Sequence, residues 1–244
     1  MSTRTLAVVC PAVSRSFVPP GAGYRTRFTA QEGEPVSQSD TVRELLDRHE
    51  TTYAEAAGIT LRDKPSPLYQ LLVLTTLSAT RISADVAVTA ARELFAAGWR
   101  TPAAMRDATW QQRVDALGRG GYRRYDESTA TALEEGATLL LESHAGDLRR
   151  IRPADRQGAV DRLVESVSSF PRIGPVGARI FVREVQDVWP EVRPYFDDRA
   201  LASAERLGLP TDPAALADLA PRGRTAHLAA ALVREARESR QVTR

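Results

Sequence analysis

The sequence has one cysteine, Cys10, and one lysine, Lys64, among its 244 residues. One cysteine can form no internal disulfide bond, and it cannot hold an iron–sulfur cluster, which needs about four cysteine ligands. The three histidines, His49, His144 and His227, are far apart in the sequence and form no metal-binding spacing. We therefore expect no iron–sulfur cluster and no metal site.

Long apolar runs are absent as well. The best candidate for a membrane span, residues 68–77, is interrupted by Tyr69, Gln70 and two threonines, and it is shorter than the roughly 18 residues that a span needs. The apolar stretch at residues 6–12 is shorter than the core of a secretory signal and contains Pro11. We expect a cytoplasmic protein with no membrane partner.

Apart from Lys64 and the histidines, every basic side chain is an arginine, while the net charge is only +2. A guanidinium group suits bidentate contacts to phosphate. A GC-rich coding sequence would produce the same preference, so the arginines alone do not identify a nucleic-acid partner. The hydrophobic content of 43% is ordinary for a globular protein.

Proline and glycine punctuate residues 1–39, which we interpret as an irregular or flexible N-terminal arm preceding a helical domain at 40–244. Capping residues and apolar residues at helical spacing predict the elements of that domain, and no segment alternates with the period of a strand. The fold is therefore expected to be all-α. The predicted helices cover about residues 39–57, 67–79, 83–97, 109–117, 126–143, 155–167, 175–188, 197–207, 212–219 and 224–237, with a short helix from 102.

Residues 170–178 read Phe-Pro-Arg-Ile-Gly-Pro-Val-Gly-Ala and lie between two predicted helices, so that a hairpin covers about residues 166–182. A tight turn beside a helix N-terminus exposes several backbone N–H groups, which form an anion site. Gly174 permits close approach of the backbone to a phosphate. The expected DNA contacts in this segment are Arg172, Ile173, Gly174, Val176 and Gly177.

Three further segments accompany the hairpin: Leu77-Ser78-Ala79-Thr80, Gly120-Gly121-Tyr122-Arg123 and Tyr195-Phe196-Asp197-Asp198-Arg199. In this order, over about residues 40–235, the chain resembles the endonuclease III superfamily of helix-hairpin-helix (HhH-GPD) base-excision DNA glycosylases. That superfamily includes adenine glycosylase and 3-methyladenine DNA glycosylase II. The resemblance implies two helical lobes with a cleft between them, duplex DNA as the partner, a nucleoid-associated monomer, and a monovalent cation as a possible ligand of the hairpin.

The resemblance also implies a catalytic aspartate about twenty residues after the hairpin. Asp197 matches best, because Arg206 follows it at the family's spacing, and Asp198 is the alternative. Cleavage of an N-glycosidic bond develops a sugar cation, which a carboxylate stabilises while it helps to activate water. The competing interpretation is that either aspartate is only a helix N-cap.

The chain departs from the family at three places. Val176 occupies the position where bifunctional members carry a Schiff-base lysine, so we expect no lyase activity. The C-terminal region lacks the family's cysteine cluster. Arg172 replaces a hairpin glycine, and it can either hinder or grip the phosphate. These departures predict a monofunctional DNA glycosylase, with a non-catalytic DNA-binding protein as the alternative and a helical interaction protein as a third possibility.

A base must leave the duplex to reach a catalytic carboxylate, and a side chain must fill the gap. The loops that match the family's gap-filling loops offer Thr80, Arg81, Arg119, Tyr122, Arg123 and Tyr125. Tyr69 and Gln70 are candidates for the base pocket. Each of these residues also fits an ordinary role, in a solvated loop or as a satisfied polar group of the core. The sequence does not identify the base.

Overall fold

The computed structural model describes residues 37–242, with side chains up to residue 239. This part of the chain contains α-helices and short 3-10 helices and no strand, so the predicted all-helical fold is confirmed. The predicted arm lies outside the described residues except for its last three, of which Gln38 and Ser39 already belong to the first helix. The elements are α1 (Gln38–Arg48), α2 (Tyr53–Ala56), α3 (Pro65–Ser78), α4 (Ala84–Ala96), α5 (Pro102–Asp107), α6 (Trp110–Arg119), α7 (Asp126–His144), η1 (Leu148–Ile151), α8 (Ala159–Ser168), α9 (Pro175–Val185), η2 (Pro190–Val192), α10 (Asp198–Arg206), α11 (Pro213–Asp218) and α12 (Thr225–Val242).

The helix predicted over 39–57 is in fact two helices. Ser37, rather than Ser39 or Asp40, caps α1, and the chain leaves helical geometry at His49. Thr52 then opens α2 through a capping box with Glu55, in which each side chain accepts a hydrogen bond from the other residue's backbone N–H. A capping box starts a new helix, so the predicted single helix was wrong.

The start of α3 also differs from the prediction. The helix begins at Pro65, with Lys64 as the N-cap, because proline is tolerated in the first turn. The hydroxyl of Ser66, which precedes the predicted start at residue 67, does not cap the helix and donates to the carbonyl of Arg100. All residues from Leu68 to Leu77 are buried, so α3 is the central helix of the described part of the chain. It contacts α4, α7 and α9.

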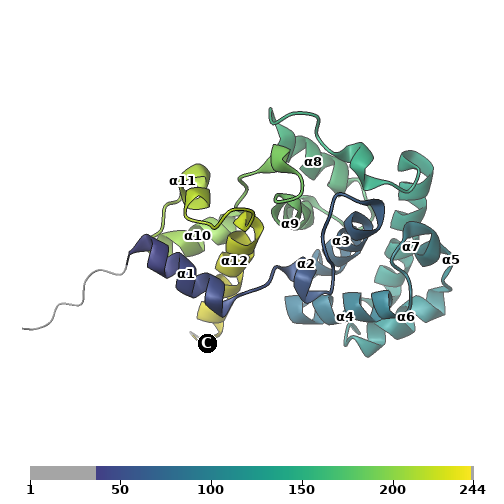
Figure 1. Ribbon diagram of the computed structural model, residues 1–244. Helices are drawn as coiled ribbons and strands as arrows, with labels where there is room; N and C mark the ends of the chain where they lie inside the picture. Colours follow the sequence, from purple (N-terminus) through teal and green to yellow (C-terminus); the bar gives the residue numbers. More distant parts are fainter. Residues whose placement is uncertain (1–36, 243–244) are drawn as a thin grey trace, which may run out of the picture. The chain divides into compact units, whose positions relative to one another are not determined.

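The helices form two groups that meet at α9 (Figure 1). In the first group, α3 is surrounded by α4 and α7, while α6 contacts both α4 and α7, and α8 lies against α9. In the second group, α12 contacts α1 and α10. Since α9 contacts α3 on one side and α12 on the other, it is the element that joins the groups.

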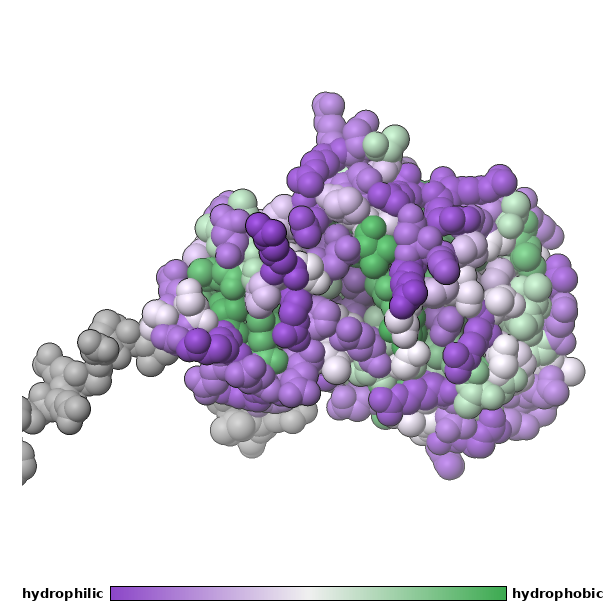
Figure 2. All heavy atoms as spheres, in the orientation of Figure 1, coloured by the Kyte–Doolittle hydropathy of each residue, from purple (hydrophilic) through white to green (hydrophobic). Residues whose placement is uncertain are grey.

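Hydrophilic residues cover most of the described surface on the face drawn in Figure 2, with apolar patches between them. Only two large apolar side chains among the described residues are strongly exposed, Trp110 at 40% and Val176 at 71%. No helix in this part of the chain is both long and apolar enough to cross a bilayer. The exposed Val176 lies in the first turn of α9, where the hairpin ends.

Candidate nucleic-acid interface and carboxylate pocket

The predicted hairpin connects α8 to α9. Two buried side chains, those of Phe170 and Ile173, attach the turn to the core. The N–H of Ile173 also donates to the carbonyl of Phe170 at 3.1 Å. Burial of Ile173 means that its side chain supports the turn and is not available for contact with a ligand. Gly174 is the N-cap of α9, and Pro175 occupies the first helical position.

Arg172 has a positive φ of 62°, in the left-handed region. This conformation costs a residue with a Cβ about 1–2 kcal/mol, and glycine adopts it freely. The structure thus explains why glycine suits this position. The Arg172 guanidinium lies 6.0 Å from the centroid of the Tyr125 ring, and that of Arg124 lies 5.3 Å from it. Two sequence-predicted residues, Arg172 and Tyr125, are therefore brought together.

The backbone N–H groups of Gly174, Val176 and Gly177 donate to no acceptor in the described part of the chain. They lie at the N-terminus of an eleven-residue helix, where the helix dipole also favours an anion. No atom of the described residues lies within 4 Å of the position that a Cβ at Gly174 would take. The predicted phosphate-approach surface is therefore open.

Gly177 has a different role. A Cβ at this position would lie 2.7 Å from the Cβ of Ala79, at the end of α3. Such a separation is far below ordinary contact, so glycine allows α9 to approach the α3 terminus closely. This contact places the hairpin end of α9 beside the loop at residues 79–83.

A pocket of about 440 Å³ opens where the two groups of helices meet. The α3–α4 loop, α9, the start of α10 and the last turns of α12 line it together with Tyr53 of α2. Six sequence-predicted residues take part: Thr80, Arg81, Val176, Gly177, Asp197 and Asp198. The predicted juxtaposition of the aspartates with the hairpin end of α9 is therefore present.

Asp197 caps α10 and is well supplied with hydrogen bonds. Its Oδ1 accepts the backbone N–H groups of Arg199 (3.1 Å) and Ala200 (3.0 Å), and its Oδ2 accepts Nη1 of Arg183 at 2.6 Å. The side chain is 13% exposed. Asp198 is exposed and has no hydrogen-bond or ion-pair partner within the described range. The two neighbouring carboxylates thus have different environments, one fixed and one free.

Arg183 is the buried cation behind Asp197, with a side chain that is only 5% exposed. Its Nε lies 3.5 Å from the fully buried Glu184 carboxylate, and its guanidinium lies 5.4 Å from the centroid of the Tyr53 ring. Burial disfavours the charge of Arg183, but Asp197 and Glu184 outweigh it and raise the pKa of the guanidinium. Burial raises the pKa of Glu184, although Arg183 acts against this effect.

Four more arginines line the pocket, and none has a carboxylate partner in the part of the chain that the structure describes. They come from the α3–α4 loop, α9, α10 and α12: Arg81, Arg179, Arg199 and Arg237. With Arg183, five guanidinium groups face two carboxylates, so the pocket carries excess positive charge. Unpaired arginines around a cavity suit an anionic ligand.

Several predicted residues lie elsewhere. The Tyr122 side chain is fully buried, and its hydroxyl is 2.7 Å from Oγ1 of Thr80 and 3.1 Å from the carbonyl oxygen of Leu77, so it cannot fill a gap in DNA as predicted. Tyr69 is also buried, and Gln70 donates to Ser66 of its own helix. Neither Tyr69 nor Gln70 lines the 440 Å³ pocket, and Tyr69 belongs to the hydrophobic core.

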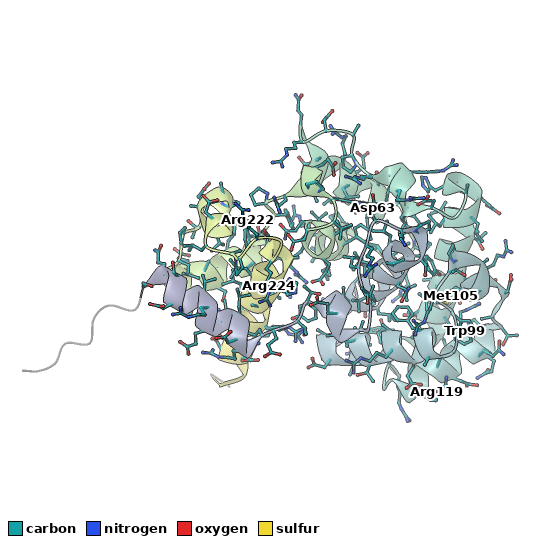
Figure 3. All side chains as sticks on the ribbon, viewed as in Figure 1. Asp63, Trp99, Met105, Arg119, Arg222 and Arg224 are labelled. Atoms are coloured by element: carbon teal, nitrogen blue, oxygen red, sulfur yellow. The ribbon has the colours of Figure 1, made fainter. Side chains whose placement is uncertain are left out.

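Two predicted DNA contacts lie on a separate surface. Arg119 is exposed, bonds Glu93 of α4 at 3.0 Å, and lies at the edge of the molecule away from α10 and α12 (Figure 3). Arg123 is exposed and lines a shallow hollow with Arg119. The structure therefore does not bring these two arginines to the pocket.

Sequence reasoning missed Arg179, Arg183, Arg199 and Arg237. A signal for the first two was present, since positions 179 and 183 follow Val176 at helical spacing and share one face of the predicted helix. No local signal marks Arg237, which reaches the pocket only through the packing of α12 against α9 and α10.

No protein-family model matches the chain, and no curated protein sequence matches it significantly. The structure is similar to that of a trapped endonuclease III–DNA covalent intermediate with an estranged adenine, with 16% identity, a TM-score of 0.47, and coverage of 79% of this chain and 81% of the other. It is also similar to a non-covalent endonuclease III–DNA complex, with 17% identity, a TM-score of 0.48, and coverage of 79% and 80%.

Proposed function

We propose that the protein is a monofunctional DNA glycosylase of base-excision repair, which hydrolyses the N-glycosidic bond of a damaged or modified base flipped out of duplex DNA. One observation carries the proposal. Asp197 and Asp198 open into a pocket that is also lined by the hairpin end of α9 and by four arginines without carboxylate partners among the described residues. A nucleotide in this pocket would have cations near its phosphates and carboxylates near its sugar.

The two aspartates suit different parts of this reaction. Three hydrogen bonds hold Asp197 in place, and one of them comes from the guanidinium of Arg183. A fixed negative charge of this kind can stabilise the cationic sugar of the transition state. Asp198 has no competing partner within the described range, so we assign it the uptake of the proton from the attacking water.

We expect no lyase activity. Val176 stands where the resemblance places the Schiff-base lysine, and a valine cannot attack a sugar. Lys64 is exposed at the N-cap of α3 and does not line the pocket. The expected product is therefore an abasic site in an intact strand.

We also propose the partner, location and cofactor content that the sequence predicts. The protein would act on duplex DNA as a nucleoid-associated monomer, without an iron–sulfur cluster. A monovalent cation at the hairpin is compatible with the proposed binding of a DNA phosphate by the hairpin. Arg172 and Tyr125, whose side chains lie next to each other, would contact the DNA backbone beside the pocket.

The test is incubation with a panel of duplexes that each carry one damaged or modified base. Free base is measured by mass spectrometry, and abasic sites are revealed by alkaline cleavage. We expect Asp197→Asn to lower the rate by about 10²-fold or more while the asparagine preserves the helix cap. Asp212→Asn is the matched control, because Asp212 caps α11 in the same way and does not line the pocket. Unchanged base release by the Asp197→Asn and Asp198→Asn variants would contradict the assignment.

The second candidate function is a DNA-binding protein without catalysis. It is favoured by the observation that both oxygens of Asp197 are already occupied by protein donors. This function predicts salt-dependent duplex binding with no released base and no effect of Asp197→Asn. In either case Arg179→Gln should reduce the slope of log affinity against log salt by about 1, while Arg106→Gln, at an exposed arginine paired with Asp107, should not. Absence of duplex binding at low salt would exclude both functions.

A further inference from the structure

A histidine and two glutamates meet where α1 ends against α12. His49 is the C-cap of α1, and Glu235 and Glu238 lie one turn apart on α12. The two helices are in contact, as Figure 1 also shows. Nε2 of His49 lies 3.6 Å from Oε2 of Glu235 and 3.9 Å from Oε2 of Glu238. One ligand atom from each residue lies within 4.8 Å of the other two.

His49 is the unusual member of this cluster. Its side chain is only 6% exposed, and its buried Nε2 has no hydrogen-bond partner among the described residues. Buried polar atoms nearly always have a partner, so an unpaired imidazole nitrogen facing two carboxylates calls for an explanation. A simple ion pair with either glutamate would be expected to close to hydrogen-bonding distance, which neither contact does.

The separations suit a metal ion better than they suit a hydrogen bond. Zinc binds imidazole nitrogen and carboxylate oxygen at about 2.0–2.2 Å, which places neighbouring tetrahedral ligands about 3.4 Å apart. The observed 3.6 Å and 3.9 Å exceed this separation by a few tenths of an ångström. Glu238 is exposed, so its side chain can make the adjustment, and the solvent side leaves the fourth position to water.

A neighbouring arginine, Arg48, holds the Glu235 carboxylate in position. Nη1 of Arg48 donates to Oε2 of Glu235 at 2.8 Å, and Nη2 of Arg48 bonds Glu44 at 3.0 Å. A carboxylate oxygen has two lone pairs, so Glu235 can keep Arg48 and still coordinate an ion. Hydrogen bonds of this kind orient carboxylate ligands in metal sites.

We propose that His49, Glu235 and Glu238 form a zinc-binding site that ties the end of α1 to the last turns of α12. The spacing of the histidines alone predicts no metal site. The glutamates reach His49 through tertiary packing, from positions 235 and 238 at the far end of the chain. The site lies outside the lining of the carboxylate pocket, so the proposal is independent of the proposed activity.

The experiment is a zinc titration of the full, tag-free chain, followed by thermal unfolding and by calorimetry. Cys10 is replaced by serine, because its thiol would be a competing ligand. Zinc near 100 times its Kd should raise Tm by about 5–10 °C for a domain of this size. His49→Gln and Glu238→Gln should each weaken zinc binding at least 10-fold, and the exposed position of Glu238 makes loss of folding an inadequate explanation for that variant.

Two controls separate the site from general surface binding. His227→Gln removes the histidine of α12, which pairs with Glu55, and Glu44→Gln removes a nearby acid that is outside the cluster. Both variants should retain the zinc affinity of the parent chain to within about 3-fold. The absence of any shift in Tm, or equal zinc affinity of the parent chain and the His49→Gln and Glu238→Gln variants, would overturn the proposal.

Discussion

Replacement of Gly177 by alanine should disturb the contact that places the hairpin beside the pocket. The new Cβ would lie 2.7 Å from the Cβ of Ala79, 3.4 Å from Cγ2 of Ile173 and 3.5 Å from the Cα of Ala79. Carbon atoms in good contact are about 3.5–4.0 Å apart, so the closest of these pairs must separate by about 1 Å. Both atoms of that pair are fixed to backbone, and no rotamer change can relieve the clash.

The cost follows from two opposing effects. Overpacking in a close helix contact typically costs about 1–3 kcal/mol. Alanine regains about 0.5–1 kcal/mol, because glycine loses more backbone entropy when it enters a helix. We therefore expect Gly177→Ala to lower the free energy of unfolding by about 0.5–2 kcal/mol, and to lower duplex affinity because the hairpin end of α9 moves relative to Arg81.

Urea denaturation of matched variants measures this effect. Gly118→Ala is the control, because Gly118 lies in α6 and nothing lies within 4 Å of its added Cβ, so we expect a gain of about 0.4–1 kcal/mol. Ala79→Gly removes the atom in the closest contact and should restore most of the stability when combined with Gly177→Ala. Equal stability of Gly177→Ala and Gly118→Ala, or the absence of such recovery in the double variant, would contradict this prediction.

Three further variants test the buried interactions near the pocket. Arg183→Met leaves the buried Glu184 carboxylate without its cation and should cost about 3–5 kcal/mol in urea denaturation, whereas a loss below about 1 kcal/mol would show that the pair is unimportant. Burial raises the pKa of Glu184 above its ordinary value of 4.5. Just above pH 4.5, the Glu184 carboxyl group therefore keeps its proton in the folded protein and loses it in the unfolded chain. The stability of the parent chain relative to Glu184→Gln should therefore fall as pH rises from about 4.5, by up to about 1.4 kcal/mol per pH unit, and parallel stability curves would refute this. Tyr122→Phe removes the hydroxyl that contacts Thr80 and Leu77 and should cost about 1–2 kcal/mol by thermal unfolding; an unchanged Tm would argue against those hydrogen bonds.

Much of the helical architecture could be predicted because capping signals are local. Ser83, Thr101, Thr109 and Asp212 begin helices where the sequence predicts them, and each side chain accepts a backbone N–H in the first turn. The break between α1 and α2 could not be predicted in the same way. Its cause is the capping box that Thr52 shares with Glu55, which lies inside an otherwise continuous helical pattern.

The candidate site was predictable only in part. Asp197 and the hairpin are marked by local sequence, but Tyr122 could not be assigned from its loop position, since the ring turns inward and its hydroxyl bonds Thr80. The cation that holds Asp197 depends on the packing of α9 against the start of α10, which no spacing in the sequence describes. Local patterns thus predicted which backbone segments gather, while the partners of individual side chains required the tertiary structure.

Among the described residues, Tyr53 is the only aromatic one in the lining of the pocket, and it is 6% exposed. The guanidinium groups of Arg183 and Arg234 lie 5.4 Å and 4.4 Å from its ring centroid. A flat base that entered the pocket would therefore contact aliphatic side chains and the edges of guanidinium groups, and no exposed aromatic face. Guanidinium groups only donate hydrogen bonds, so under the proposed function the arginine edges of the pocket would favour bases that present carbonyl oxygens to them.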